Sequence, residues 1–217
     1  MEPEHFYFIS DDFFNKFPQE EFLMQNKQER HARPCFFVFA DPEHSDLLWC
    51  VPISSQVSKY NTIIKNKFEH LQHRGIHYPK CSTLRFAKVL GHSSAFLIQN
   101  MFPVTKEYVR EEYLDAKTQQ PVTISQASAN DICINAKNVL QLVSNGHQNL
   151  VYVDILKMRQ TLLAELEHHN ELEPSKEKTP PSSLQERIQN AQLKADQYNK
   201  RETMSIVPLQ INEIGER

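Results

Sequence analysis

The stretch WCVPISSQVSKY, residues 49–60, passes from an apolar segment typical of a β-strand into a polar turn. The turn carries Ser54 and Ser55, and Lys59 follows soon after. Hydroxyl groups donate hydrogen bonds to phosphate oxygens, and an ammonium group supplies positive charge. The stretch therefore predicts a strand that ends in a candidate phosphate-binding turn.

A second apolar run, CFFVFA, precedes this stretch and opens on Arg33-Pro34. The polar residues 41–46 between the two runs are typical of a loop, because they contain Pro42 and several residues that favour turns. The pattern predicts a hairpin with Arg33 at one end of the chain segment and Ser54, Ser55 and Lys59 at the other.

Four features follow one another along the chain. They are the N-terminal segment FYFIS (6–10), Arg33-Pro34 before a strand, the VPISS turn (51–55) with a lysine soon after, and a later apolar helical segment. This order resembles the ToxN/AbiQ family of type III toxin–antitoxin endoribonucleases, most closely its CptN-like branch. The resemblance covers roughly residues 5–166 and is sharpest at Pro52–Ser55.

The resemblance implies an α+β fold, with a bent, mostly antiparallel β-sheet core surrounded by about four helices. It also implies a metal-independent, sequence-selective endoribonuclease that uses 2′-OH attack and leaves 2′,3′-cyclic phosphate ends. Such a toxin is inhibited by a small repeat antitoxin RNA in a protein–RNA hetero-oligomer, cuts cellular or phage RNA, and acts in phage defence. The catalytic positions that it implies are Ser54, Ser55, Lys59, Arg33 and Tyr7.

One departure concerns Lys59, which follows Ser55 by four residues, later than the lysine of the better-known members. Each implied position also has a structural interpretation. Ser54 or Ser55 fits the N-cap of the helix that follows, Arg33 fits a strand-edge charge, and Tyr7 fits a core aromatic. The two uses are compatible, because the N-terminus of a helix is itself an anion site.

The net charge of −3 and the pI near 6.4 argue against a protein that coats nucleic acid non-specifically. Residues 59–88 nevertheless hold seven lysines and arginines and one acidic residue, Glu69. This local surplus predicts an RNA-binding surface, although a solvated basic face is the simpler interpretation. The candidate RNA-binding residues are Lys65, Lys67, Arg85, Lys88 and Arg30.

Hydrophobic periodicity and turn residues predict the order of the elements. Strands are expected at 6–10, 34–40, 47–53, 83–90, 94–98 and 121–124. Helices are expected from residue 12 or 13, and at 56–73, 127–145 and 153–168. Thr105 is expected to cap a helix. The polar segment 24–32 is expected to be a loop that can lie over a site. A ToxN-like domain is expected at 1–168, and a linker with a polar helical C-terminal extension at 169–217.

No cofactor or metal is expected. The ten histidines lack ligand partners at metal-binding spacing, and only His92, expected in a tight turn, is a candidate acid or base. The four cysteines are expected to be reduced and mostly buried. Without a long apolar run or a signal-peptide pattern, the chain is expected to be cytoplasmic, with no membrane partner. The alternative function is a non-catalytic RNA-binding or protein-interaction module.

Overall fold

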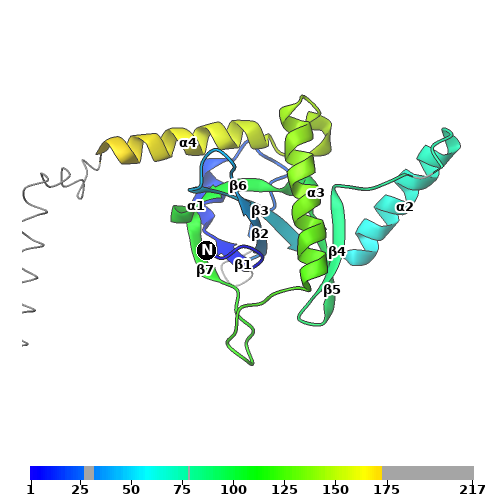
Figure 1. Cartoon of the computed structure of the whole chain (residues 1–217), viewed down its shortest axis with the longest axis horizontal. Helices are drawn as coiled ribbons and strands as arrows, with labels where there is room; N and C mark the ends of the chain where they lie inside the picture. The colour runs from blue at the N-terminus through cyan, green and yellow to red at the C-terminus, as the bar shows by residue number, and fades with distance from the viewer. Residues whose placement is uncertain (27–31, 78, 173–217) are drawn as a thin grey trace, which may run out of the picture. The chain divides into compact units, whose positions relative to one another are not determined.

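The computed structural model describes residues 1–26, 32–77 and 79–172, and residues 1–169 form one compact unit (Figure 1). The strands are β1 (Phe6–Ile9), β2 (Pro34–Ala40), β3 (Leu47–Ser54), β4 (Leu84–Val89), β5 (His92–Leu97), β6 (Phe102–Thr105) and β7 (Val109–Glu112). The helices are α1 (Asp11–Lys16), α2 (Val57–His73), α3 (Gln126–Ser144) and α4 (Ile155–Leu172), with short 3₁₀ turns at 98–100, 106–108 and 148–150.

All strand pairs are antiparallel, and their order is β4-β5-β3-β2-β1-β7, with β6 beside the first half of β3. The protein is therefore an α+β fold built on one antiparallel sheet with helices around it, as expected.

Strand β3 changes neighbours along its length, and this change bends the sheet. Leu47–Cys50 pair with β6, whereas Ile53 and Ser54 pair with β5. Pro52, which has no N–H to donate, lies between the two pairings, where a proline is tolerated in a strand. Ser54 consequently lies at the junction between the main sheet and the β4–β5 hairpin.

The core is rich in aromatic side chains. Phe6, Phe36 and Phe96 come from three strands, and their ring centroids lie 5.0, 5.4 and 6.1 Å apart, distances at which tilted aromatic pairs attract. Helix α3 covers this sheet with the stripe Ala129, Ile132, Ala136, Val139 and Val143. The first half of α4 adds Ile155, Met158 and Leu162 to the same core.

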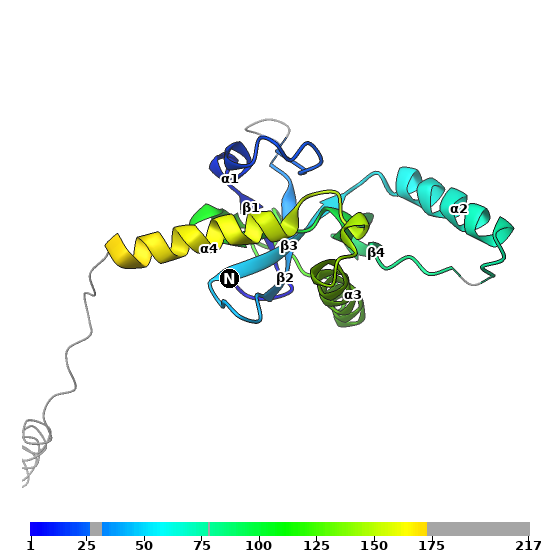
Figure 2. The same cartoon turned by 90° about the horizontal axis from the view of Figure 1, so that it is seen from above.

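Helix α2 differs from this pattern. Figures 1 and 2 show it projecting away from the sheet, while α3 and the first half of α4 lie against it. Of its apolar stripe, only Tyr60 is buried, next to Leu84, Ala95 and Leu97, and Ile63 is 43% exposed. The periodicity predicted the helix correctly, but not that Tyr60 would be the only buried residue of this helix.

A glycine with positive φ follows each of the helices α2 and α3. Gly75 follows α2 with φ +85°, and Gly146 follows α3 with φ +97°. The N–H of Ile76 bonds to the carbonyl of Leu71 at 3.0 Å, and that of His147 to Leu142 at 3.0 Å. These are the backward bonds of a helix C-terminus closed by a left-handed residue.

Several local predictions were wrong. The expected strand at 121–124 is a single bridge between Leu114 and Pro121. Thr105 is the N-cap residue of the 3₁₀ turn at 106–108, as expected of a cap position, but its side chain forms no cap bond. His92 begins β5 instead of lying in the turn, which Leu90 and Gly91 form with positive φ. Helix α4 runs to Leu172, beyond the helix end predicted at 168, and the C-terminal extension from residue 173 lies outside the described residues.

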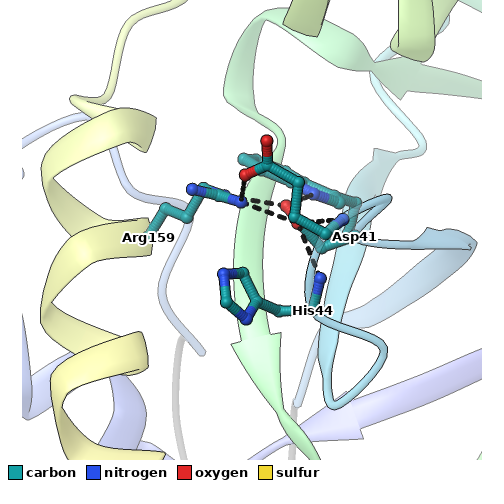
Figure 3. Close-up of polar contacts among 5 residues, drawn as sticks. Asp41, His44 and Arg159 are labelled. Atoms are coloured by element: carbon teal, nitrogen blue, oxygen red, sulfur yellow. Dashed lines mark hydrogen bonds and ion pairs between the residues drawn. The ribbon is translucent and has the colours of Figure 1, made fainter.

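Hydrogen bonds and ion pairs connect α4 to the loop after β2 (Figure 3). Asp41, only 5% exposed, accepts two bonds of 2.8 Å from the Arg159 guanidinium and one of 3.0 Å from the Trp49 indole. The backbone N–H groups of Glu43 and His44 also donate to Asp41. Arg159 further contacts the Glu43 carboxylate at 2.7 Å. Despite its burial, which favours the neutral acid, these donors lower the pKa of Asp41 to about 2.

Candidate active site

The Ser54–Ser55 turn joins the end of β3 to the start of α2. Ser54 is 9% exposed, and its Oγ accepts a hydrogen bond of 3.2 Å from the Gln56 N–H. Ser55 is exposed; its carbonyl accepts from the Val57 N–H at 2.9 Å, while its hydroxyl bonds to no residue in the described part of the chain. Gln56 is the N-cap of α2 and forms no side-chain cap bond. The Ser55 hydroxyl is thus available to a ligand beside the helix start.

Arg33 lies at the same end of the hairpin as the serine turn. Cys35 faces Pro52 in the β2–β3 register, so the residues just outside this pair, Arg33 and Ser54, meet at one edge. The Nη1 of Arg33 donates to the carbonyl oxygen of Ile53 at 3.0 Å. The structure thus brings together the basic residue and the hydroxyl turn, which are about twenty residues apart in the sequence.

Arg33 has one unusual feature. Its Nε is buried and, within the residues described, is the only buried side-chain nitrogen or oxygen atom without a hydrogen-bond partner. Leaving a buried donor unpaired costs about 1–3 kcal/mol, so such an atom calls for an explanation. A guanidinium also forms strong, charge-assisted bonds to phosphate oxygens. The side chain therefore retains an unpaired donor next to its Nη1 contact with Ile53, beside the serine turn.

Lys59 lies in the first turn of α2, on the helix that follows the serines. Its side chain is exposed, and its ammonium is 5.8 Å from the centroid of the Tyr60 ring. Tyr60 in turn packs with Ala95, the residue that faces Ser54 across β3 and β5. Lys59 is thus close to the turn in the chain, but no described contact joins it to either serine.

Tyr7 is placed differently. It lies on β1, which pairs with β2 and β7 and is separated from β3 by β2. Its hydroxyl accepts from the Glu2 N–H at 2.7 Å and donates to the Glu2 carbonyl at 3.3 Å. Burial raises the pKa of the Tyr7 phenol, although the bond to Glu2 opposes this. The described contacts do not join Tyr7 to Arg33 or the serines, and its catalytic role stays a prediction.

The predicted RNA-binding residues are not equally available. Lys65, Lys67 and Lys88 are exposed, and Lys65 has a loose pair with Glu69 at 3.8 Å. Arg85 is half-buried and bonds to the Asp131 carboxylate at 2.7 Å and to the backbone carbonyls of Cys81 and Leu84. Arg30 lies outside the described residues. Arg85 therefore links β4 to α3 in addition to any role with RNA.

Two further side chains contact Arg33 and were not singled out from the sequence. Met24 approaches Nη1 with its sulfur at 4.0 Å, and the Asn26 carboxamide accepts from the Arg33 backbone N–H at 2.9 Å. Both belong to the segment expected to be a loop able to lie over a site. The polar composition of that segment indicated a loop, but no residue pattern indicated which side chain would contact Arg33.

The described residues contain no group of three or more His, Cys, Asp or Glu side chains placed to hold a metal ion. The four cysteines are free, with Cys35 and Cys50 buried, and burial raises the pKa of both thiols. No described helix has the length and apolar composition needed to cross a membrane.

Comparison with known proteins identifies the class of fold. No protein-family model matches the sequence, and no curated protein matches it. Solved structures do match: AbiQ, a lactococcal anti-phage endoribonuclease of the type III toxin–antitoxin system, aligns with a TM-score of 0.56 and 14% identity, over 75% of this chain and 98% of AbiQ.

A second match comes from a bacterial type III toxin–antitoxin system in which a non-coding RNA pseudoknot selectively inhibits the toxin. It aligns with a TM-score of 0.53 and 15% identity, over 76% of this chain and 99% of the other. The chain therefore has the fold of the type III toxins, as the resemblance implied. At this identity, the comparison establishes the fold alone.

Proposed function

We propose that this chain is the toxin of a type III toxin–antitoxin system, an endoribonuclease that a small repeat antitoxin RNA holds inactive and that acts against phage. The observation that carries the proposal is the combination of a toxin fold over nearly the full length of both neighbours with Arg33 bonded to Ile53, directly before the Ser54–Ser55 turn. The fold alone would not suffice, because one fold supports many functions.

The proposed chemistry is attack of an RNA 2′-OH on the adjacent phosphate. The 2′-oxygen forms a bond to phosphorus, the bond to the 5′-oxygen breaks, and the products are a 2′,3′-cyclic phosphate and a 5′-OH end. Negative charge gathers on the phosphate oxygens, where the Ser55 hydroxyl and the Arg33 guanidinium would donate hydrogen bonds. Lys59 would add positive charge from the first turn of α2.

The reaction also needs groups that carry protons. The 2′-OH must lose a proton and the leaving 5′-oxygen must gain one. Tyr7 was the predicted carrier, but its hydroxyl is held by the Glu2 backbone. If Tyr7 acts, that hydroxyl must be released when RNA binds. A Tyr7→Phe variant tests the role directly, because it removes only the hydroxyl.

Expression of the chain without its antitoxin tests the proposal as a whole. We expect growth arrest in the host, together with new RNA fragments that carry 5′-OH and cyclic phosphate ends when these ends are mapped. Co-expression of the short tandem repeats expected next to the gene should restore growth. A purified protein that binds RNA but leaves it intact would instead identify a non-catalytic RNA-binding module.

Cleavage should persist in excess EDTA. The proposed site uses hydroxyl and guanidinium groups, and the described residues offer no metal-binding cluster. The measurement compares initial rates for a defined RNA with EDTA and with added magnesium or zinc. A rate that disappears with the chelator and returns with the metal would contradict the proposed chemistry.

Charge reversal on α2 and β4 should weaken antitoxin binding. Changing Lys65, Lys67 and Lys88 to Glu should lower RNA affinity and reduce the slope of log K against log salt by about 0.7 for each lost contact to single-stranded RNA. Folding should survive, because the three side chains are exposed. Filter binding over a salt series measures both quantities.

The control for this experiment changes Lys106 and Lys117, which are exposed lysines outside α2 and β4, to Glu. Arg85 is kept, because losing its bond to Asp131 would confuse a folding defect with a binding defect. If the triple variant binds RNA with unchanged affinity and slope, the RNA does not use this surface.

A further inference from the structure

The Asn26 side chain joins three segments beside the candidate active site. Its amide nitrogen donates to the Ile9 carbonyl at 3.0 Å and to the Asp11 carboxylate at 2.9 Å, at the end of β1 and the start of α1. Its amide oxygen accepts from the Arg33 N–H at 2.9 Å. One carboxamide thus fixes the position at which the chain enters β2.

The backbone bond at Arg33 matters because the guanidinium is held at a second point. Nη1 bonds to the Ile53 carbonyl, next to Ser54, whereas the buried Nε has no partner among the described residues. An arginine side chain has several rotatable bonds and loses much conformational entropy when it is ordered. Two anchors, at the backbone and at Nη1, limit the positions that Nε can take.

We propose that Asn26 is a positioning residue that holds Arg33 so that its guanidinium can bond to the phosphate bound at the Ser54–Ser55 turn. This inference rests on the proposed function, since it assigns to Asn26 the geometry of that same site. Asn26 itself touches no reacting atom. It acts through the Arg33 backbone, and its bond to the Ile9 carbonyl connects that backbone to the end of β1.

An Asn26→Ala variant should keep its affinity for RNA but cut it slowly. Misplacing a catalytic group by about 1 Å can cost about 100-fold in rate, so we expect kcat to fall by about 10-fold to 100-fold with KM nearly unchanged. The assay uses purified full-length protein and a defined RNA that the wild type cuts.

Two control variants separate positioning from loop stability. Gln25→Ala changes the exposed amide next in the chain, and Asp11→Ala removes one of the bonds of Asn26 but leaves the bond to Arg33. Both should cut RNA at nearly the wild-type rate. If Asp11→Ala lowers kcat as much as Asn26→Ala does, anchoring of the loop explains the effect, and the assignment of Asn26 to Arg33 is wrong.

The decisive comparison is the double variant Asn26→Ala, Arg33→Ala. If Asn26 acts only through Arg33, the double variant should have the kcat of Arg33→Ala alone, because the guanidinium that Asn26 positions is already absent in Arg33→Ala. Losses that multiply would show an independent role and overturn the proposal. So would an Asn26→Ala variant with the kcat of the wild type.

Failure of the proposed function gives a different result. If the wild type cuts no RNA under conditions in which it is folded and binds RNA, the endoribonuclease proposal and the positioning role fail together. If the wild type cuts and Asn26→Ala cuts equally well, only the positioning role fails. Hydrogen exchange at the Arg33 amide, faster in Asn26→Ala than in Gln25→Ala, checks independently that the bond exists in solution.

Discussion

A Ser55→Ala variant should lose about 100-fold to 1,000-fold in RNA cleavage, the usual cost of removing one hydrogen-bond donor that stabilises charge in a transition state. On expression, the same change should abolish toxicity. The Ser55 hydroxyl is exposed and bonds to no described residue, so no folded-state contact in the described part of the chain is lost with it. We therefore expect the free energy of unfolding to stay within about 1 kcal/mol of the wild type.

Ser58→Ala is the matched control, because Ser58 is an exposed serine three residues further on, in the first turn of α2. It should be toxic at equal expression and should cut RNA at the wild-type rate. Full toxicity of Ser55→Ala would show that the assignment of the serine turn to the active site is wrong. Retained RNA binding with lost cutting would instead support catalysis rather than binding as the function of Ser55.

The strands around the site could be predicted because each combines local signals that agree. The runs at 34–40 and 47–54 are apolar, rich in aromatic and β-branched side chains, and separated by a polar loop with a proline. Antiparallel pairing then places the residues outside the two strands at one edge. For this reason Arg33 and Ser54 could be expected near one another from the sequence alone.

The contacts of Asn26 and Tyr7 could not be predicted in the same way. Asn26 bonds to residues before it and after it in the chain, and nothing in a polar loop distinguishes that amide from its neighbours. Tyr7 is buried on β1 like Phe6 and Ile9, as the apolar segment indicated, but that pattern does not indicate that Glu2 turns back to occupy the hydroxyl. Both outcomes depend on tertiary placement of a flanking segment.

Helix α2 was predicted from the sequence, but its low burial was not. Its apolar spacing is regular, which usually indicates a buried face, but only Tyr60 is buried. The spacing determines which side chains share a face, and the path of the chain determines whether that face meets the sheet. Here the helix leaves β3 at the bend and turns away from the core (Figure 2).

The Asp41–Arg159 pair should be the most sensitive point for stability outside the aromatic core. Arg159→Met removes the guanidinium and leaves the Asp41 carboxylate buried with only the Trp49 indole and two backbone N–H groups. Removing one partner of a buried ion pair costs about 3–5 kcal/mol, a large share of the stability of an ordinary domain. Urea unfolding at pH 7 measures the loss.

Arg110→Met is the matched control, because Arg110 is exposed on β7 and forms no ion pair among the described residues. It should change the free energy of unfolding by no more than about 0.5 kcal/mol. The double variant Asp41→Asn, Arg159→Met should recover part of the loss, since it removes the uncompensated charge. A loss in Arg159→Met no larger than in Arg110→Met would mean that the pair contributes little to the folded state.

The same pair predicts how stability depends on pH. The pKa of Asp41 is about 2 in the folded state and 3.8 for the ordinary carboxyl, so the unfolded chain takes up the proton first as the pH falls. Its contribution, about 2 kcal/mol for a shift of this size, is therefore complete above the unfolded pKa and is lost as the pH falls toward the folded pKa. The informative quantity is the difference in the free energy of unfolding between variants, because it isolates the contribution of this pair.

In Arg159→Met the pKa of Asp41 rises toward or above its ordinary value, because the guanidinium that favoured the carboxylate is gone and burial still opposes the charge. The free energy of unfolding should thus fall less steeply between pH 4 and pH 2 in Arg159→Met than in Arg110→Met, and parallel curves would place the acid sensitivity of the protein elsewhere.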